Sequence, residues 1–535
     1  MFKQFKFLIF LTTLKFAYLT DDHQSKNVII IVADDLGFHD LSFRGSNEIP
    51  SYNIDALAYN GIILDRFYTA PMCTPSRAAL LTGKYPHHLG MQNYVIVSDE
   101  PYGLPLDVKL MPEFFKDAGY VTHLIGKWHL GFFKEEYTPF HRGFDHVFGY
   151  LGPYIDYWDY TLQMFNRNYS RGYDLRRNLT VDKTYDRVYA TDMFTQETIN
   201  AIENHNQEKP LFLILNHLAP HAGNVDFPLQ AKEEDLKKFP YIENEERKTL
   251  AAMISSLDES VGRIIDALHR TGMLENSIIV FFSDNGGPTT FQHATTASNY
   301  PLRSQKESAW EGGIRTDALI YSPSLPSGVL RTQYFHISDL LPTLLTLAET
   351  NIKVKDKIDG IDLSRMIMND MPPYRDEIVT VDDVSGYGSY IYSIFKLVNG
   401  SSSNGRADGW IGSNNNSDVN KDDYITGVLN SDVAQILKNY ENPLIPEEIL
   451  EIRENATVKC SGIISDCDLL RGPCLFDISR DPCEEKNLEP TNPLLFDAML
   501  KLYHSSLKKL VPSHKKPLDP QCDPANFNFT WKWWE

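Results

Sequence analysis

Residues 27–35 read Asn-Val-Ile-Ile-Ile-Val-Ala-Asp-Asp, an apolar and largely β-branched run that ends in two carboxylates. A strand that is buried on both faces needs apolar residues at successive positions, so this run is typical of an interior strand in a mostly parallel sheet. The pattern returns at residues 120–125, 210–215 and 277–282, and helical patterns at 110–118 and 250–268 alternate with these runs. The alternation predicts an α/β fold, with a large, mostly parallel sheet sandwiched by helices.

Polar or ionisable residues follow each of the four apolar runs. In chain order they are Asp34 and Asp35, then Lys127 and His129, then His217 and His221, and finally Asp284 and Asn285. In open α/β sheets, ligands bind beyond the carboxyl ends of the strands. We therefore expect these side chains to meet in one functional site.

Two of the strand ends carry oxygen ligands suited to a hard cation. Asp34, Asp35, Asp284 and Asn285 offer carboxylate and amide oxygens, which suit Ca²⁺ or, less well, Mg²⁺, whereas zinc prefers His or Cys. Either pair alone would be equally compatible with a solvated turn or a helix cap. Together, and with Gly286-Gly287 allowing close backbone approach, they favour a metal site.

The segment from Cys73 to Lys84 predicts a helix that begins at a cysteine. Pro75 suits the first helical turn, and Gly83 suits the left-handed residue that ends a helix. The N-terminal N–H groups and the helix dipole favour negative charge at residue 73, so a thiol there is expected to have a lowered pKa.

Five further residues are candidates for binding an anion or moving a proton: Arg77, Lys127, His129, His221 and Lys306. Taken singly, a Lys or Arg is usually solvated and a His usually structural. Lys127 and His129 are two apart on an extended segment, so their side chains point the same way. His217 and His221 compete for one role; His221 is preferred because it lies in the loop after Pro220, although His217 is nearer the strand end.

The motifs together resemble the type I sulfatases, a family of the alkaline phosphatase-like superfamily, and within it the arylsulfatase B type. The signature is Cys73-x-Pro75-x-Arg77, in which the family oxidises the cysteine to formylglycine. The likeness runs from residue 27 to about 363 and resumes at 475–482, through the motifs at 33–37, 73–83, 126–131, 283–287 and 310–315. It implies the alkaline phosphatase-like fold, with a large mixed, mostly parallel sheet sandwiched by helices and a smaller C-terminal α+β domain that contains an antiparallel sheet.

The resemblance also implies roles. Asp34, Asp35, Asp284 and Asn285 would bind Ca²⁺ together with an oxygen of modified residue 73, and Arg77 would stabilise the formylglycine hydrate. Lys127 and His221 would hold sulfate oxygens, His129 would take a proton from the hydrate, and Lys306 would lie near the ester oxygen. One hydroxyl of the hydrate would attack sulfur, and collapse of the other would release sulfate.

The substrate that the resemblance implies is a sulfated carbohydrate, such as N-acetylgalactosamine-4-sulfate units of glycosaminoglycans, or else a small aryl or metabolite sulfate. A phosphomonoester or phosphonate hydrolase and an inactive secreted binding protein are the alternatives. Relative to arylsulfatase B, residues 93–105 lack the expected cysteines, which leaves Cys522 without its usual partner and puts the substrate preference in doubt. The formylglycine-generating enzyme would be a partner during maturation; the sequence does not indicate an oligomeric state.

The composition fits a protein of the secretory pathway, either lysosomal or secreted. Residues 1–20 have the charged and apolar regions of a signal peptide, and no other apolar run is long enough to span a membrane. Sequons for N-glycosylation occur at Asn168, Asn178, Asn399, Asn415, Asn455 and Asn528. A net charge of −20 argues against nucleic acid or an anionic membrane as a partner, and basic residues that bind an anion must be concentrated locally.

The length of the chain and a change in its sequence pattern predict two domains after the signal peptide. Residues 26–370 carry the βα rhythm and form the predicted catalytic α/β domain. Residues 371–535, with a Gly-, Ser- and Asn-rich stretch and short strand-like pieces, form the predicted smaller α+β domain. Cys73 stands alone, and five cysteines lie in the last quarter, so at least one of these is unpaired within the chain; Cys474 with Cys483, and Cys460 with Cys467, are the hypothesised pairs.

Overall fold

The computed structural model describes residues 25–164, 170–290, 294–412, 420–440, 444–462 and 467–535. The predicted signal peptide and the sequons at Asn168 and Asn415 lie outside these ranges. In the described part, no helix is long and apolar enough to cross a membrane.

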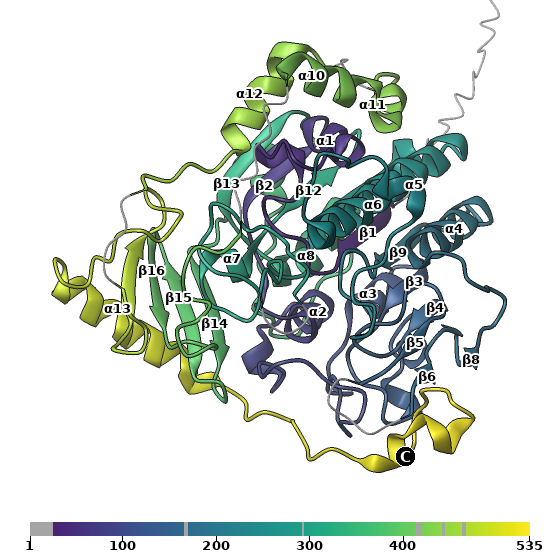
Figure 1. The fold of residues 1–535 in the computed structure, drawn as a ribbon, viewed down its shortest axis with the longest axis horizontal. Coiled ribbons are helices and arrows are strands. Elements are labelled where there is room, and N and C mark those ends of the chain that lie inside the picture. Colours follow the sequence, from purple (N-terminus) through teal and green to yellow (C-terminus); the bar gives the residue numbers. More distant parts are fainter. Residues whose placement is uncertain (1–24, 165–169, 291–293, 413–419, 441–443, 463–466) are drawn as a thin grey trace, which may run out of the picture.

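A large mixed sheet forms the centre of the molecule (Figure 1). Its middle strands β10, β1, β9, β3 and β4 are all parallel, and antiparallel strands flank them on both sides. β1 is buried along its whole length, which accounts for its continuous apolar sequence. In spatial order the strands are β11 (Arg315–Thr316), β2 (Ile62–Tyr68), β12 (Ala318–Tyr321), β10 (Ser277–Ser283), β1 (Asn27–Ala33), β9 (Leu211–Asn216), β3 (Val121–Lys127), β4 (His146–Tyr150), β7 (Arg176–Arg177) and β8 (Thr180–Val181), with β13 (Val329–His336) paired to β2.

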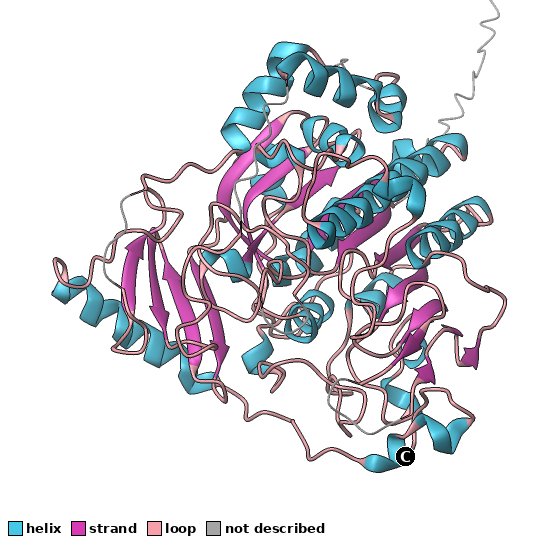
Figure 2. Cartoon of the chain, in the orientation of Figure 1, coloured by secondary structure: helices cyan, strands magenta, loops and turns pink. Residues whose placement is uncertain are grey.

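Helices cover the sheet, as Figure 2 shows. One group packs around α6, the longest helix, and a second group packs around α2. The first group contains α1 (Tyr52–Tyr59), α4 (Ala190–Glu203), α5 (Glu233–Leu236) and α6 (Glu245–Arg270); the second contains α2 (Cys73–Thr82), α3 (Met111–Asp117) and α8 (Leu340–Leu347). The short helices α7 (Glu311–Ile314) and α9 (Ser364–Asn369) and the hairpin of β5 (Thr161–Leu162) with β6 (Gly172–Tyr173) complete this part.

A smaller antiparallel sheet follows in the sequence, at the left of Figure 1. Its order is β14 (Glu377–Asp382), β15 (Tyr387–Tyr392), β16 (Phe395–Asn399) and β17 (Cys474–Asp477), and α13 (Pro493–Ser506) packs against β15 and β16. The predicted fold class is thereby confirmed: a mixed, mostly parallel sheet between helices, and a second, antiparallel sheet nearer the C-terminus.

Two C-terminal stretches pack into the core of the large sheet instead of the small one. Helices α10 (Lys421–Asn430), α11 (Asp432–Leu437) and α12 (Pro446–Ala456) cover the region of α1 and β13. Trp531 is buried in the same core, and its indole N–H donates to Leu162 O over 3.0 Å. The domain boundary at 370/371 stays a prediction, because the chain crosses between the two sheets more than once after it.

The segments predicted from apolar runs form strands β1, β3, β9 and β10, and the predicted helices form α3 and α6. Helix α2 begins at Cys73 and ends at Thr82, and Gly83 follows as its cap with a left-handed φ of 65°, as the sequence predicts.

The hypothesised cysteine pairs are wrong. Cys460 is bonded to Cys483 and Cys467 to Cys474. Cys474 begins strand β17, and an extended strand carries the chain away from its starting residue, so Cys483 lies beside Cys460 instead of Cys474. Cys522 is buried and unpaired, in agreement with the odd number of C-terminal cysteines.

Four sequons fall within the described residues. Asn455 and Asn528 are exposed, whereas Asn178 and Asn399 are half-buried, and Asn178 Oδ1 accepts a hydrogen bond from Val147 N. Glycosylation at these positions stays a prediction.

Two glycines with almost the same φ, one within β3 and one in the turn after α3, allow a test of strand packing. Gly126 and Gly119 have φ values of 93° and 90°, but a Cβ on Gly126 would lie 1.9 Å from Asn216 O, whereas one on Gly119 would meet nothing within 4 Å. We expect Gly119→Ala to lower the free energy of unfolding by about 1–2 kcal/mol through backbone strain alone. Gly126→Ala should cost about 1–3 kcal/mol more, because β3 and β9 must separate. Urea unfolding measures both; equal losses would contradict this explanation.

Candidate active site

The candidate site lies where the carboxyl ends of the central strands meet the first turn of α2. Asp34 follows β1, Asp284 follows β10, and Lys127 is the last residue of β3. Because these strands are parallel, their carboxyl ends lie at the same edge of the sheet. Cys73 begins α2 at that edge, so helix and strands deliver their side chains to one place.

Three buried carboxylates form the centre of the site. Asp34, Asp35 and Asp284 have no solvent-exposed surface. Asp35 has a positive φ of 66°, and its backbone N–H donates to Asp284 Oδ1 over 3.2 Å. Asn285 Nδ2 donates to Asp35 Oδ1 over 2.6 Å. Asp35, Asp284 and Asn285 are thus joined by hydrogen bonds, and a carboxylate oxygen of Asp34 lies within 4.8 Å of one of Asp35.

Three cations surround these carboxylates. Lys127 Nζ lies 2.6 Å from Asp34 Oδ2, and Lys306 Nζ lies 2.6 and 2.7 Å from the two oxygens of Asp35. Arg77 donates through Nη2 to Asp284 over 2.8 Å. Burial acts to raise the pKa of Asp34, but the charges of Lys127, His221, Arg77 and Lys306 outweigh it and lower that pKa.

Cys73 is held between opposite charges. Its Sγ lies 3.4 Å from Asp34 Oδ1, 3.8 Å from Asp35 Oδ1 and 3.4 Å from Lys306 Nζ. Burial, together with the carboxylates of Asp284 and Asp34, raises the pKa of the Cys73 thiol well above its usual value. The lowered pKa expected from the helix terminus is therefore wrong: burial, together with the carboxylates of Asp284 and Asp34, raises the pKa instead, and the thiol is not a ready nucleophile.

The structure separates the two competing histidines. His221 Nε2 lies 3.4 Å from Asp35 Oδ2, whereas His217 Nε2 lies 3.0 Å from Ser260 Oγ on helix α6, away from the cluster. His221 Nδ1 lies 2.6 Å from the carbonyl oxygen of Ala222, which can only accept, so Nδ1 carries the proton and Nε2 faces the site. Burial lowers the pKa of His221 to about 4 despite the nearby Asp35.

His129 is positioned by its backbone as well as by its ring. It has a φ of 57°, its carbonyl accepts from Thr74 Oγ1 over 3.0 Å, and its Nε2 lies 2.9 Å from Ile96 O. Nε2 must therefore donate, which leaves the lone pair on Nδ1. Nδ1 is buried and has no hydrogen-bond partner among the described residues. Burial, with the charges of Lys127 and Arg77, holds the pKa of His129 well below its usual value.

The donor set fits a hard divalent cation. Ligand atoms of Asp34, Asp35, Cys73 and His221 lie within 4.8 Å of one another, and Asn285 Oδ1 is buried with no partner in the described part of the chain. Burial and the charge of Asp34 raise the pKa of Asp284 to about 6. A bound cation would therefore stabilise the ionised form of this carboxylate. Carboxylate and amide oxygens are the ligands that Ca²⁺ and Mg²⁺ take.

Three aromatic residues at the site gave no signal in the sequence. The ring of Tyr154 stacks on His221 with centroids 5.8 Å apart, and Tyr157 Oη donates to His221 O over 2.9 Å. Tyr94 packs against the cluster of Met72, Cys73 and Val95. These tyrosines lie on loops without periodicity, so only the folded chain brings them to the site.

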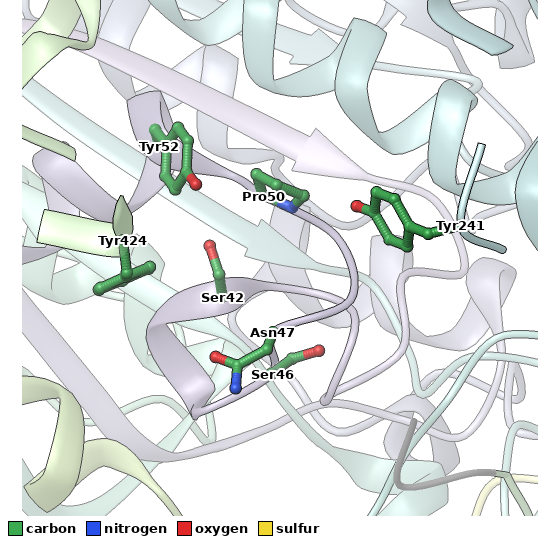
Figure 3. Close-up of a pocket in the computed structure, with 7 residues that line it drawn as sticks. All are labelled: Ser42, Ser46, Asn47, Pro50, Tyr52, Tyr241 and Tyr424. Atoms are coloured by element: carbon green, nitrogen blue, oxygen red, sulfur yellow. The ribbon is translucent and has the colours of Figure 1, made fainter. Parts of the chain in front are cut away.

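Figure 3 shows a separate hollow of about 260 Å³ that other residues line. Tyr52, Tyr241 and Pro50 form much of its wall, with Ser42, Ser46, Asn47 and Tyr424. None of the site residues predicted from the sequence lines it.

Comparisons with known proteins agree with this geometry. Residues 26–350 match the family model described as Sulfatase. Arylsulfatase J of Mus musculus is 34% identical over 521 residues, which cover 95% of this chain and 80% of that protein. N-acetylgalactosamine-6-sulfatase of Homo sapiens is 30% identical over 64% of this chain and 65% of its own length.

Among solved structures, Ps i-CgsB is 28% identical with a TM-score of 0.71, over 92% of this chain and 94% of that one. A second structure of that protein is a complex with k-i-k-neocarrahexaose. The particular likeness to arylsulfatase B stays a prediction. The chain belongs to the sulfatase family and is a sulfuric ester hydrolase.

Proposed function

We propose that this chain hydrolyses sulfate esters of carbohydrates with a formylglycine formed from Cys73 and a Ca²⁺ ion held by Asp34, Asp35, Asp284 and Asn285. The observation that carries the proposal is the position of residue 73: its Sγ lies 3.4 Å from both Asp34 Oδ1 and Lys306 Nζ, where a thiol is not ionised. A residue placed there for thiolate chemistry would need the opposite environment.

The modified residue would supply a hydrated aldehyde, with one hydroxyl to attack sulfur and a second to expel the product. The metal would supply positive charge for the sulfate oxygens, with residue 73 as a further ligand. Mg²⁺ is the weaker candidate, because it demands a stricter octahedral geometry than this set of two adjacent aspartates suggests.

The cations of the chain itself would bind and orient the sulfate. Lys127 and Lys306 are buried beside the nucleophile position, and Arg77 Nε and Nη1 have no hydrogen-bond partners among the described residues. Preorganised positive charge in a site that excludes water stabilises the charge that accumulates on sulfuryl oxygens. Arg77 is anchored by Asp284, so it needs little reorganisation to act.

Two histidines and Lys306 would move protons. His129 Nδ1 has a lone pair and no partner in the described chain, which suits it to accept the proton of the second hydroxyl at residue 73. The charge of Asp35 and its hydrogen bond help to raise the pKa of Lys306 well above its usual value despite burial, so it stays protonated and can donate to the leaving oxygen. His221 Nε2 lies on the other side of Asp35. Because Nδ1–H is already donated to Ala222 O, Nε2 would have to take up a second proton before it could hold a sulfate oxygen or share that donation.

Sulfated carbohydrates are the substrate class that the relatives support, since one is named for N-acetylgalactosamine-6-sulfate and another was solved with a neocarrahexaose. The 4-sulfate of N-acetylgalactosamine is the more specific proposal, with small aryl sulfates as the alternative. The formylglycine-generating enzyme would act on Cys73 in the secretory pathway, and the mature protein would be lysosomal or secreted.

Replacement of residue 73 tests the nucleophile. We expect Cys73→Ala to abolish sulfate release while leaving the far-UV spectrum and melting temperature of the protein unchanged, because the side chain is small and buried. Mass spectrometry of the peptide that contains residue 73 should show an aldehyde in the active protein. Turnover by the alanine variant, or a fully active protein with an unmodified thiol, would contradict the proposal.

The histidine pair provides a matched test of position. His221→Gln should lower kcat/KM by about 10²–10⁴, since it removes a group that handles charge or protons in the site. His217→Gln, equally buried but bonded to Ser260, should lower stability and leave kcat/KM of the folded protein within a few-fold. A larger kinetic loss for His217→Gln than for His221→Gln would reverse the assignment.

Metal binding should be visible as stability. After exhaustive chelation, added Ca²⁺ should raise the melting temperature, because a ligand that binds only the folded state stabilises it by about 2.7 kcal/mol at one hundred times its Kd. Asn285→Ala should weaken this response, whereas Asp356→Asn, at an exposed position outside the site, should not. A melting temperature indifferent to Ca²⁺ in the parent protein would rule out the metal assignment.

A further inference from the structure

We propose that residues 508–516, named the basic strap, bind anionic groups of a polyanionic sulfated oligosaccharide next to the reacting residue. This inference rests on the proposed function and narrows its substrate class. The strap contains Lys508, Lys509, His514, Lys515 and Lys516, and no Asp or Glu occurs between Asp497 and Asp519. In a chain with a net charge of −20, this is a local concentration of the kind that an anionic substrate requires.

The strap is fixed to the loop that follows helix α2. Val511 N donates to His87 O over 2.8 Å, and His514 N donates to Gly90 O over 3.1 Å. Gln92 Nε2 returns a hydrogen bond to Val511 O. In Figure 1 this yellow stretch runs from α13 below α2 toward the C-terminus, so it joins the small sheet to the edge of the large one.

The ring of Tyr94 lies between the basic strap and residue 73. Lys515 Nζ lies 5.4 Å from the ring centroid of Tyr94, and Tyr94 packs against the cluster that contains Cys73. Lys515 also lies 3.1 Å from Glu100 Oε1, which fixes its direction. The strap therefore passes close to the site while its charges remain outside the buried cluster.

Most of the charge on the strap is not neutralised by the protein. Lys508, Lys509 and Lys516 are exposed, and no carboxylate among the described residues pairs with them. Asp382 and Asp383 accept hydrogen bonds from Asn93, and Glu100 pairs with Lys515, so none of these three carboxylates forms an ion pair with the exposed lysines. Three cations are thus available to a ligand in solution.

The arrangement favours a long substrate over a small one. A single sulfate ester would be held by the buried cations Arg77, Lys127 and Lys306, which leaves nothing for the strap to bind. Residues 510–516 have no regular secondary structure, and seven residues can span at most about 25 Å. Groups beyond the reacting sugar, such as further sulfates or carboxylates of the same oligosaccharide, would meet these lysines.

The test uses a triple variant, Lys508→Gln, Lys509→Gln and Lys516→Gln, in the full-length protein. Its matched control removes three exposed lysines away from the strap: Lys209→Gln, Lys353→Gln and Lys355→Gln. The substrates are a chondroitin sulfate hexasaccharide and the aryl sulfate 4-nitrocatechol sulfate. We expect the ratio of kcat/KM for the hexasaccharide to that for the aryl sulfate to fall about tenfold in the strap variant, through KM, and to stay unchanged in the control.

Binding separates this proposal from the catalytic one. In a Cys73→Ala background, titration of the hexasaccharide should show a Kd that rises about tenfold with the strap substitutions and depends less on salt, because exposed charges are screened. Equal Kd values with and without the strap lysines, or equal losses in the strap and control variants, would overturn the inference. If the parent protein binds through the strap but releases sulfate from neither substrate, the proposed function fails and the strap assignment stands.

Discussion

Balance of buried charge at the carboxyl edge of the large sheet is the constraint on which this structure depends. Asp34, Asp35 and Asp284 are removed from water, and an isolated buried carboxylate is costly unless it is paired. Lys127, Lys306 and Arg77 compensate for them, each through a contact of 2.6 to 2.8 Å. Removing one member would leave its partner buried and uncompensated, so the same six residues organise both the fold at this edge and the chemistry there.

That balance also sets the state of residue 73. Next to these carboxylates the thiol is held in its neutral form, and the N-terminus of α2 does not reverse this. The neighbouring carboxylates can accept hydrogen bonds from an oxygen nucleophile or bind a metal ion. The fixed cations beside them suit a tetrahedral anion that faces this nucleophile. Membership of the sulfatase family follows from sequence similarity. The proposed formylglycine comes from the Cys73-x-Pro75-x-Arg77 signature, and this local environment supports it.

Much of the fold could be predicted because its signals are local. The run at 28–32 is apolar at every position, since β1 is buried on both faces, and Pro75 and Gly83 mark the two ends of α2. The cysteine pairs could not be predicted, because the order of cysteines in a chain does not say which of them a strand brings together. The choice between His217 and His221 also needed the structure. Both histidines follow β9, but the side chain of His217 contacts Ser260 on helix α6, whereas that of His221 lies beside Asp35.

The sequence by itself determined the sheet, the helix that begins at Cys73 and the set of residues at the strand ends, because each of these is encoded in contiguous segments with a definite period or motif. Only the tertiary structure decided the neutral thiol, the histidine that faces the site, and the tyrosines that surround it. It alone brings the lysines after α13 to the loop beyond α2, more than four hundred residues earlier in the chain. These features depend on contacts between distant segments, and no local pattern records such contacts.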